Sequence, residues 1–250
     1  PALFGQLGGT FKTTQIPTEY VRLESFFSSQ NRFFRTFWLP TVQRFGLNSK
    51  EHPAMSGRDF LGTYDLFSMV NKLKTIEDIL RNASVGYVVV PYDSEGEIFL
   101  SDRKYDEKKY EKIIGEIKKI TWLKQIDGFG KIAVFEVPNP KDHFWSTKEG
   151  LVKSYKYINP TKYEVDIQNA KKGDIVVFSE SYDPKWNAGT ESSRKYGETL
   201  NSFVLPKDGN YELDIFYAPQ KYVEVGLWVS GLTILGSLSY LVFGTKAKKW

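Results

Sequence analysis

The stretch VGLWVSGLTILGSLSYLVFG, residues 225–244, holds 20 consecutive residues without a charged side chain. A helix needs roughly 20 apolar residues, at about 1.5 Å each, to cross a hydrocarbon core about 30 Å thick. Four glycines interrupt the stretch. They are common in membrane-spanning helices and costly in soluble ones. The stretch therefore predicts a transmembrane helix over residues 225–244, in preference to a buried helix of a soluble core.

The residues around this stretch predict its orientation. Trp228 and Tyr240 lie near its two ends, where interfacial aromatic side chains are enriched. Three lysines, Lys246, Lys248 and Lys249, follow it, and lysine-rich flanks face the cytoplasm. We therefore expect a protein of the cell membrane with the lipid bilayer as a partner, residues 1–221 extracytoplasmic and residues 245–250 a cytoplasmic tail.

Composition excludes several classes of protein. The net charge is +4, and three of these charges come from the tail, so the remainder carries about +1. A body this neutral lacks the basic stripe of a nucleic-acid-binding protein. There is no cysteine, which excludes disulfides and thiolate metal ligands. The two histidines, His52 and His143, lack zinc-motif spacing. The sequence predicts neither a metal nor a cofactor.

The first residues, PALFGQLGG, have no basic region followed by an apolar region, as a signal peptide would. Export of the body would then depend on something upstream. We expect residues 1–19 to be a loop that follows an earlier, missing membrane span, and the chain to be a fragment of a longer membrane protein.

Residues 20–138 alternate between helical and strand patterns, and one helical stretch is expected from about residue 59 to residue 73. Val85–Val90 is a continuous apolar run, typical of a strand buried on both faces in a parallel sheet. Residues 106–122 repeat apolar side chains at helical spacing, and residues 124–127 and 131–137 form a hairpin pattern around Asp127–Gly130. These patterns predict an α/β domain.

Residues 141–220 contain strand patterns only, after the linker-like Pro138–Pro140. Turn signals separate short alternating runs, as in an antiparallel β-sandwich. The expected strands are residues 152–158, 162–169, 174–180, 202–205 and 211–217. The predicted fold class is therefore α+β: an N-terminal α/β unit, then an antiparallel β-sandwich, then a C-terminal transmembrane helix that follows the last strand almost directly.

Four segments carry a resemblance to a known group of proteins. They are VFSESYDPKW (177–186), VLPKDGNYELDIFYAP (204–219), FRTFWLP (34–40) and INPTKY (158–163). Together with the terminal apolar stretch, they resemble the exported C-terminal region of YfhO-like and C-type (GT-C) polytopic membrane glycosyltransferases, some of whose relatives are arabinofuranosyltransferase-like. The segment KWNAGT (185–190) departs from the pattern of that group.

The resemblance implies an extracytoplasmic accessory domain of an enzyme that uses polyprenyl-phosphate-linked sugars. In that group the catalytic carboxylate lies between early membrane helices, so the resemblance assigns no catalytic residue to this chain. The implied partners are a cell-envelope glycan or a lipid-linked sugar. The alternative is a non-enzymatic cell-surface binding or assembly module anchored by one C-terminal helix. A hydrolase is a third reading, without a recognisable catalytic constellation to support it.

Two groups of residues are candidate binding sites. Glu180, Tyr182, Asp183 and Trp186 gather at a strand end, where an indole face and carboxylates suit a sugar. Packing of Trp186 into the core beside a Pro184 turn explains the same pattern. Arg35 and Trp38 form the second group. Arginine there suits a phosphate or carboxylate ligand, or an ion pair with Asp59 or Glu24.

Overall fold

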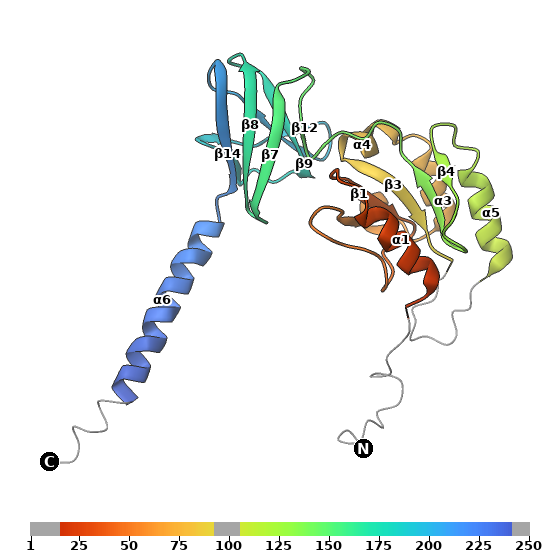
Figure 1. Ribbon diagram of the computed structural model, residues 1–250, viewed down its shortest axis with the longest axis horizontal. Coiled ribbons are helices and arrows are strands. Elements are labelled where there is room, and N and C mark those ends of the chain that lie inside the picture. Colours follow the sequence, from red (N-terminus) through yellow and green to blue (C-terminus); the bar gives the residue numbers. More distant parts are fainter. Residues whose placement is uncertain (1–15, 93–105, 242–250) are drawn as a thin grey trace. The chain divides into compact units, whose positions relative to one another are not determined.

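The computed structural model describes residues 16–92 and 106–241 (Figure 1). The protein is a mixed α+β chain with antiparallel sheets and one C-terminal apolar helix. It divides into two compact units, Pro1–His143 (unit 1) and Phe144–Trp250 (unit 2). The division falls shortly after the Pro138–Pro140 segment predicted as a linker. Each unit is described by itself.

Unit 1 contains a five-stranded mixed sheet in the order β2-β1-β3-β5-β4. The strands are β1 (Arg35–Trp38), β2 (Ala54–Ser56), β3 (Val85–Val90), β4 (Lys124–Ile126) and β5 (Ala133–Glu136). All six residues of β3 are buried, as its continuous apolar run predicts. β3 pairs with β1 in parallel but with β5 antiparallel, because β5 returns through the hairpin from β4. The parallel surroundings expected for β3 therefore exist on one side only.

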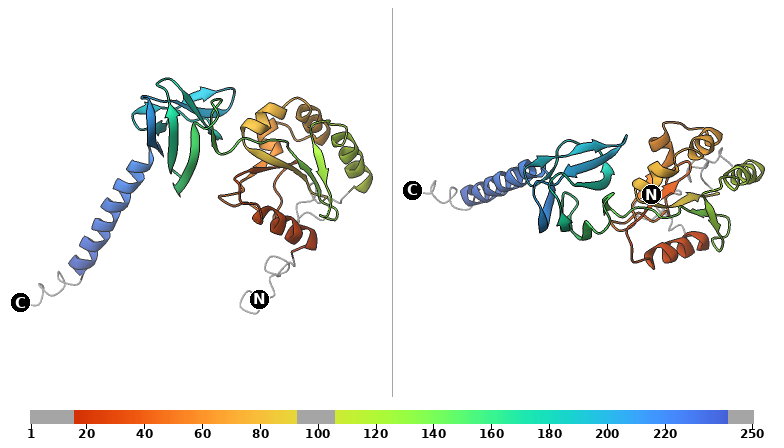
Figure 2. Two further views of the ribbon diagram at one scale, coloured as in Figure 1. Left: turned by 45° about the horizontal axis from the view of Figure 1, so that its top comes forward. Right: turned by 90° about the horizontal axis from the view of Figure 1, so that it is seen from above.

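The helices of unit 1 within the described residues are α1 (Thr18–Ser28), α2 (Gly57–Leu61), α3 (Leu66–Leu73), α4 (Glu77–Asn82) and α5 (Glu107–Ile117). Figure 2 shows α1 on one face of the sheet and α5 on the other. Side chains of α1 pack into a core with β1 and β3; they are Tyr20, Leu23 and Phe27. α1 begins at Thr18, so the end of the segment expected to be a loop is helical, while residues 1–15 lie outside the described residues.

Unit 2 consists of short strands before its terminal helix. They are β6 (Phe144–Trp145), β7 (Val152–Asn159), β8 (Lys162–Ala170), β9 (Ile175–Ser181), β10 (Trp186–Ala188), β11 (Glu191–Ser192), β12 (Arg194–Tyr196), β13 (Leu200–Val204) and β14 (Gly209–Tyr217). The sheets run β11-β10-β14-β8-β7 and β12-β13-β9-β6. Every pair described in unit 2 is antiparallel. The five predicted strands are present with small boundary shifts.

Both sheets of unit 2 contribute side chains to one apolar core. Along β8, Tyr163, Val165 and Ile167 are buried and alternate with partly exposed polar residues, as the period-2 pattern predicts. From the other sheet, Phe178 stacks on Phe144 with ring centroids 4.5 Å apart. Burial of apolar area at about 25 cal/mol per Å² is the main force that joins the two sheets.

The C-terminal helix, α6 (Gln220–Ser239), is long and apolar enough to cross a membrane. It begins five residues before the predicted span, because Gln220–Glu224 continue the same helix. None of its residues is buried against the rest of the protein. The predicted end of the span, residues 242–244, and the tail, residues 245–250, lie outside the described residues.

Candidate functional site

The passage from sheet to helix in unit 2 is short and fixed by hydrogen bonds. Only Ala218 and Pro219 separate the end of β14 from α6. The backbone N–H of Tyr217 donates to the carbonyl of Thr161 at 2.9 Å, and that of Ala218 donates to the carbonyl of Lys185 at 2.9 Å. The start of α6 is thereby attached to the β7–β8 turn and to the corner between β9 and β10. We call this end of unit 2 the junction.

Asp183, a predicted sugar-binding residue, bonds within the junction. One carboxylate oxygen accepts from the backbone N–H of Lys185 at 2.9 Å, and the other accepts from the Tyr217 hydroxyl at 2.8 Å. These two bonds lower the pKa of Asp183. The same carboxylate raises the pKa of the Tyr217 hydroxyl, with burial adding to the effect. Asp183 therefore links the β9–β10 corner to the last residue of β14.

This linkage predicts a pH dependence. A carboxyl group with a lowered pKa stabilises the folded state above its unfolded pKa of about 4, and that contribution disappears as the pH falls through the folded value. We expect the urea midpoint of unit 2 to fall less between neutral pH and pH about 3 in Asp183→Asn than in the natural chain. Pulse proteolysis across this pH range measures the midpoint; equal pH profiles for the two proteins would refute the expectation.

Trp186 is part of the core. It is 8% exposed, and its ring lies 5.0 Å from that of Phe178 and 5.3 Å from that of Tyr217, centroid to centroid. A sugar-stacking indole needs an open face, which Trp186 does not have. The structure therefore corrects its assignment as a stacking platform, and the packing alternative describes it.

Glu180, Tyr182 and Asp183 all keep some exposed surface, unlike the buried Trp186. Tyr182 is 36% exposed, and its backbone N–H donates to the carbonyl of Thr199 at 2.7 Å. Glu180 is half-buried, and its backbone carbonyl accepts a hydrogen bond from Asn201. The structure thus brings Glu180, Tyr182 and Asp183 together on one corner, above the buried Trp186.

Asn201, which the sequence patterns did not single out, organises this corner from β13. Its side chain has no exposed surface. Its amide NH₂ donates to the carbonyls of Glu180 and Ser181 at 2.8 and 2.9 Å. Its oxygen accepts from the Asp183 N–H at 3.0 Å and from the Ser193 hydroxyl at 2.8 Å. An asparagine directly before the predicted strand at residues 202–205 was the available signal, since buried polar groups are hydrogen-bonded in folded proteins.

Arg35 and Trp38 form a separate group, in unit 1. Arg35 is 5% exposed, donates to the carbonyl of Ala83 at 2.9 Å and lies 5.1 Å from the centre of the Phe33 ring. Burial, and next the charge of Arg35, lower the pKa of His143 well below its ordinary value. Trp38 is fully buried and donates to the Thr36 hydroxyl at 2.8 Å. Both predicted binding residues are thus core residues, with no open surface for a phosphate or a sugar.

Unit 1 also has a small cavity between α5 and the β4–β5 hairpin. Its volume is about 270 Å³, and its polar lining includes Glu107, Glu111, Asp127 and Lys131. The Tyr110 hydroxyl at its edge lies 2.6 Å from the carbonyl of Lys131 and accepts from the Ala133 N–H at 3.1 Å. Within residues 16–92 and 106–241, no three acidic or histidine side chains converge as metal ligands.

The junction is therefore the best-defined candidate site. An exposed apolar helix begins there, next to a corner whose polar groups are fixed by hydrogen bonds. Comparisons with known proteins found no match: no family model, no curated protein and no solved structure matches the chain.

Proposed function

We propose that the chain is an extracytoplasmic accessory domain of a polytopic, glycosyltransferase-like membrane protein, held at the bilayer by α6. In this proposal units 1 and 2 lie outside the cytoplasm as an α/β domain and a β-sandwich, and neither is catalytic. The observation that supports attachment to the bilayer is the surface of α6, and the glycosyltransferase-like assignment rests on the sequence resemblance. Its apolar side chains from Val225 to Leu238 are 54–75% exposed.

Such a surface is at odds with a helix in water. A soluble monomer rarely exposes apolar patches beyond a few hundred Å², whereas α6 presents apolar side chains around its whole circumference from Val225 onward. A helix that is apolar all round is typical of a membrane span. Its hydroxyls support the same placement: Thr233 and Ser237 donate to carbonyls four residues earlier, both at 2.8 Å, which satisfies them without water.

The direction of the span follows from the lysines after residue 244. The absence of cysteine makes this topology easy to test, because any introduced thiol is the only one in the chain. Lys156→Cys places the thiol on an exposed strand of unit 2, and Lys248→Cys places it in the tail. In cells that express the natural gene with one of these changes, and with any cysteine outside these 250 residues replaced by serine, we expect a membrane-impermeant maleimide to label the thiol at position 156 before permeabilisation. The thiol at position 248 should be labelled only afterwards, and the reverse order would overturn the proposed topology.

The proposed ligand is a cell-envelope glycan or a lipid-linked sugar, as the family resemblance implies. With Trp186 buried, recognition would depend on the outward corner of Glu180 and Tyr182, and on polar contacts rather than indole stacking. Glycan-array binding by the full chain in lipid nanodiscs tests this ligand class, with Tyr182→Ala as the variant. Binding that is lost in the variant supports the proposal.

A second candidate is a non-enzymatic surface module for binding or assembly, anchored by one helix. The observation that favours it is the structural use of the β9–β10 corner: Asp183 and Asn201 are occupied with internal hydrogen bonds, and Trp186 with the core. Absence of glycan binding by the natural chain, together with a correct membrane topology, would favour this candidate over the first.

A further inference from the structure

We propose that the junction end of unit 2 rests in the headgroup layer of the bilayer, with Ile158 and Phe216 as the side chains that contact lipid. This inference rests on the proposed placement of α6 in the membrane. It adds a second contact between the protein and the bilayer, made by the folded domain itself.

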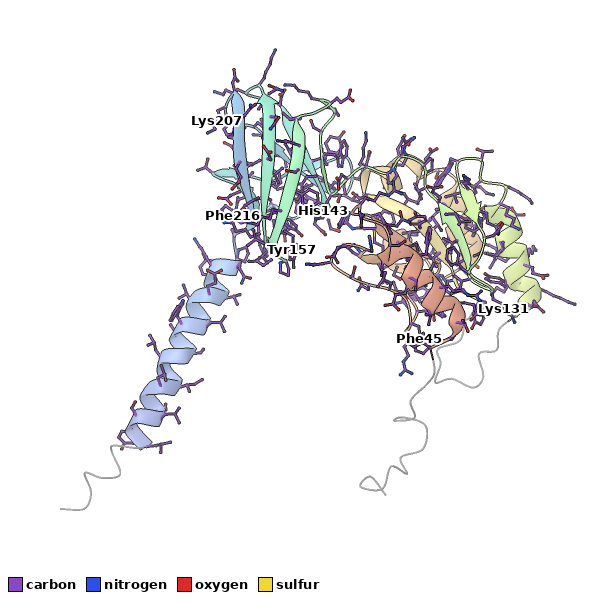
Figure 3. All side chains as sticks on the ribbon, in the orientation of Figure 1. Phe45, Lys131, His143, Tyr157, Lys207 and Phe216 are labelled. Atoms are coloured by element: carbon purple, nitrogen blue, oxygen red, sulfur yellow. The ribbon has the colours of Figure 1, made fainter. Side chains whose placement is uncertain are left out.

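Strand register brings these two residues to the same end of the sheet. Phe216 of β14 lies opposite Lys162 of β8, and Lys162 lies opposite Asn159 of β7. Neighbouring strands are about 4.8 Å apart, so Ile158 and Phe216 are separated by roughly two strand spacings. Figure 3 shows Tyr157 and Phe216 at the end of unit 2 where α6 begins, and Lys207 at the opposite end.

Both side chains point away from the core of unit 2. Ile215 is buried in that core and Tyr217 packs against it, so Phe216, between them, faces the other side of the strand. Tyr157 packs against the same core. The register of β7 is irregular between Tyr157 and Asn159, and Ile158, which lies there, is at the surface with 37% of its area exposed. Phe216 is half-buried. An isoleucine and a phenylalanine thus occupy the outer surface of the sheet beside the root of the helix.

Chain connectivity limits how far this end can lie from the bilayer. Ala218 and Pro219 span at most about 7 Å. The polar first residues of α6, Gln220–Glu224, add about 7.5 Å at 1.5 Å per residue. The headgroup layer on each side of the hydrocarbon is itself roughly 5–8 Å thick. The two lengths add to about 15 Å at most. Because Tyr217 and Ala218 are tied to the β7–β8 turn and the β9–β10 corner, connectivity keeps these segments within about 10 Å of the outer boundary of that layer and allows them to rest on it.

The surrounding charges are balanced. Lys162 pairs with Asp214 at 3.1 Å, the charge of Lys185 acts on the nearby Asp183 carboxylate, and Lys221 lies in the same helix as Glu224. Anionic lipid therefore gains little from this surface. Aromatic and apolar side chains, including Tyr222, which is 70% exposed on the first turn of α6, are the residues that favour the bilayer interface. The partner is the headgroup–acyl boundary of ordinary, uncharged phospholipid.

The test uses single cysteines in the full chain, reconstituted in phosphatidylcholine nanodiscs and labelled with an environment-sensitive fluorophore. Ile158→Cys reports the junction end, Lys207→Cys the opposite end of unit 2, and Leu232→Cys the middle of α6. The quenchers are aqueous iodide and a nitroxide attached to the lipid headgroup. We expect the label at position 158 to be several-fold better protected from iodide than that at 207, and to be quenched by the nitroxide while 207 is not.

Three other results would each contradict this inference or the membrane placement on which it rests. A label at 158 that iodide quenches like 207, with 232 protected, overturns this inference and leaves the proposed function standing. Protection at 158 without nitroxide quenching means that protein, not lipid, covers Ile158, and also overturns it. A label at 232 that iodide quenches freely overturns the membrane placement of α6, and the proposed function with it.

Discussion

Replacement of Trp186 by alanine is expected to lower the free energy of unfolding of unit 2 by about 3–5 kcal/mol, the range for truncating a large buried aromatic side chain. The indole is 8% exposed and contacts Tyr163, Phe178 and Tyr217, so its removal leaves a cavity between the two sheets. Urea pulse proteolysis of the full chain in detergent micelles, following the fragment from unit 2, measures the change.

Trp228→Ala is the matched control, because Trp228 lies on α6 and is 75% exposed. It removes the same side chain without touching the core of unit 2, and the urea midpoint of unit 2 should not move. A Trp186→Ala protein with unchanged stability but altered ligand binding would instead restore Trp186 to the binding surface, against the packing that the structure describes.

Local sequence patterns predicted several individual strands. In β8, alternation identifies the residues that face the core, and in β3 a continuous apolar run identifies a strand buried on both faces. These features are local, because side chains two residues apart share one face of a strand. The short strands β6, β10, β11 and β12, each of two or three residues, offer too few residues for a period.

Breaks inside helical patterns were harder to predict. The apolar spacing of residues 59–73 indicates one helix, but α2 ends at Leu61 and α3 begins at Leu66. Gly62 adopts φ +62°, a left-handed conformation typical of a helix C-terminus. Asp65 then starts α3 by accepting a hydrogen bond from the backbone N–H of Ser68 at 2.7 Å. Both signals are present in the sequence, but each is common outside helix ends.

The roles of the candidate site residues could not be predicted from the sequence for a different reason. Arg35, Trp38 and Trp186 are residue types that serve equally in binding sites and in cores. Burial decides between these uses, and burial depends on segments distant in sequence: Ala83 for Arg35, and Tyr217 for Trp186. The same holds for Asn201, whose partners at Glu180 and Ser181 lie about twenty residues away.

Asn201→Asp is expected to destabilise unit 2 more than Asn201→Ala, although aspartate is nearly the same shape. The natural side chain donates two hydrogen bonds to the carbonyls of Glu180 and Ser181. A carboxylate has no donor to offer there and would set a negative charge against two carbonyl oxygens, with no exposed surface to hydrate it. Urea pulse proteolysis at neutral pH compares the two variants.

The alanine variant sets the scale of this comparison. It leaves buried groups without a partner, at about 1–3 kcal/mol each, so we expect a loss of about 3 kcal/mol or more from the several bonds of Asn201.

Asn187→Ala is the control. Asn187 is half-buried on β10, and its side chain donates to the carbonyl of Lys185 and accepts from the Ser192 hydroxyl near the surface, so water can replace it. A smaller loss for Asn201→Ala than for Asn187→Ala would mean that the corner does not depend on its buried amide. Because the Asp183 N–H donates to the Asn201 side chain, loss of Asn201 should also weaken the attachment between the β9–β10 corner and the root of α6.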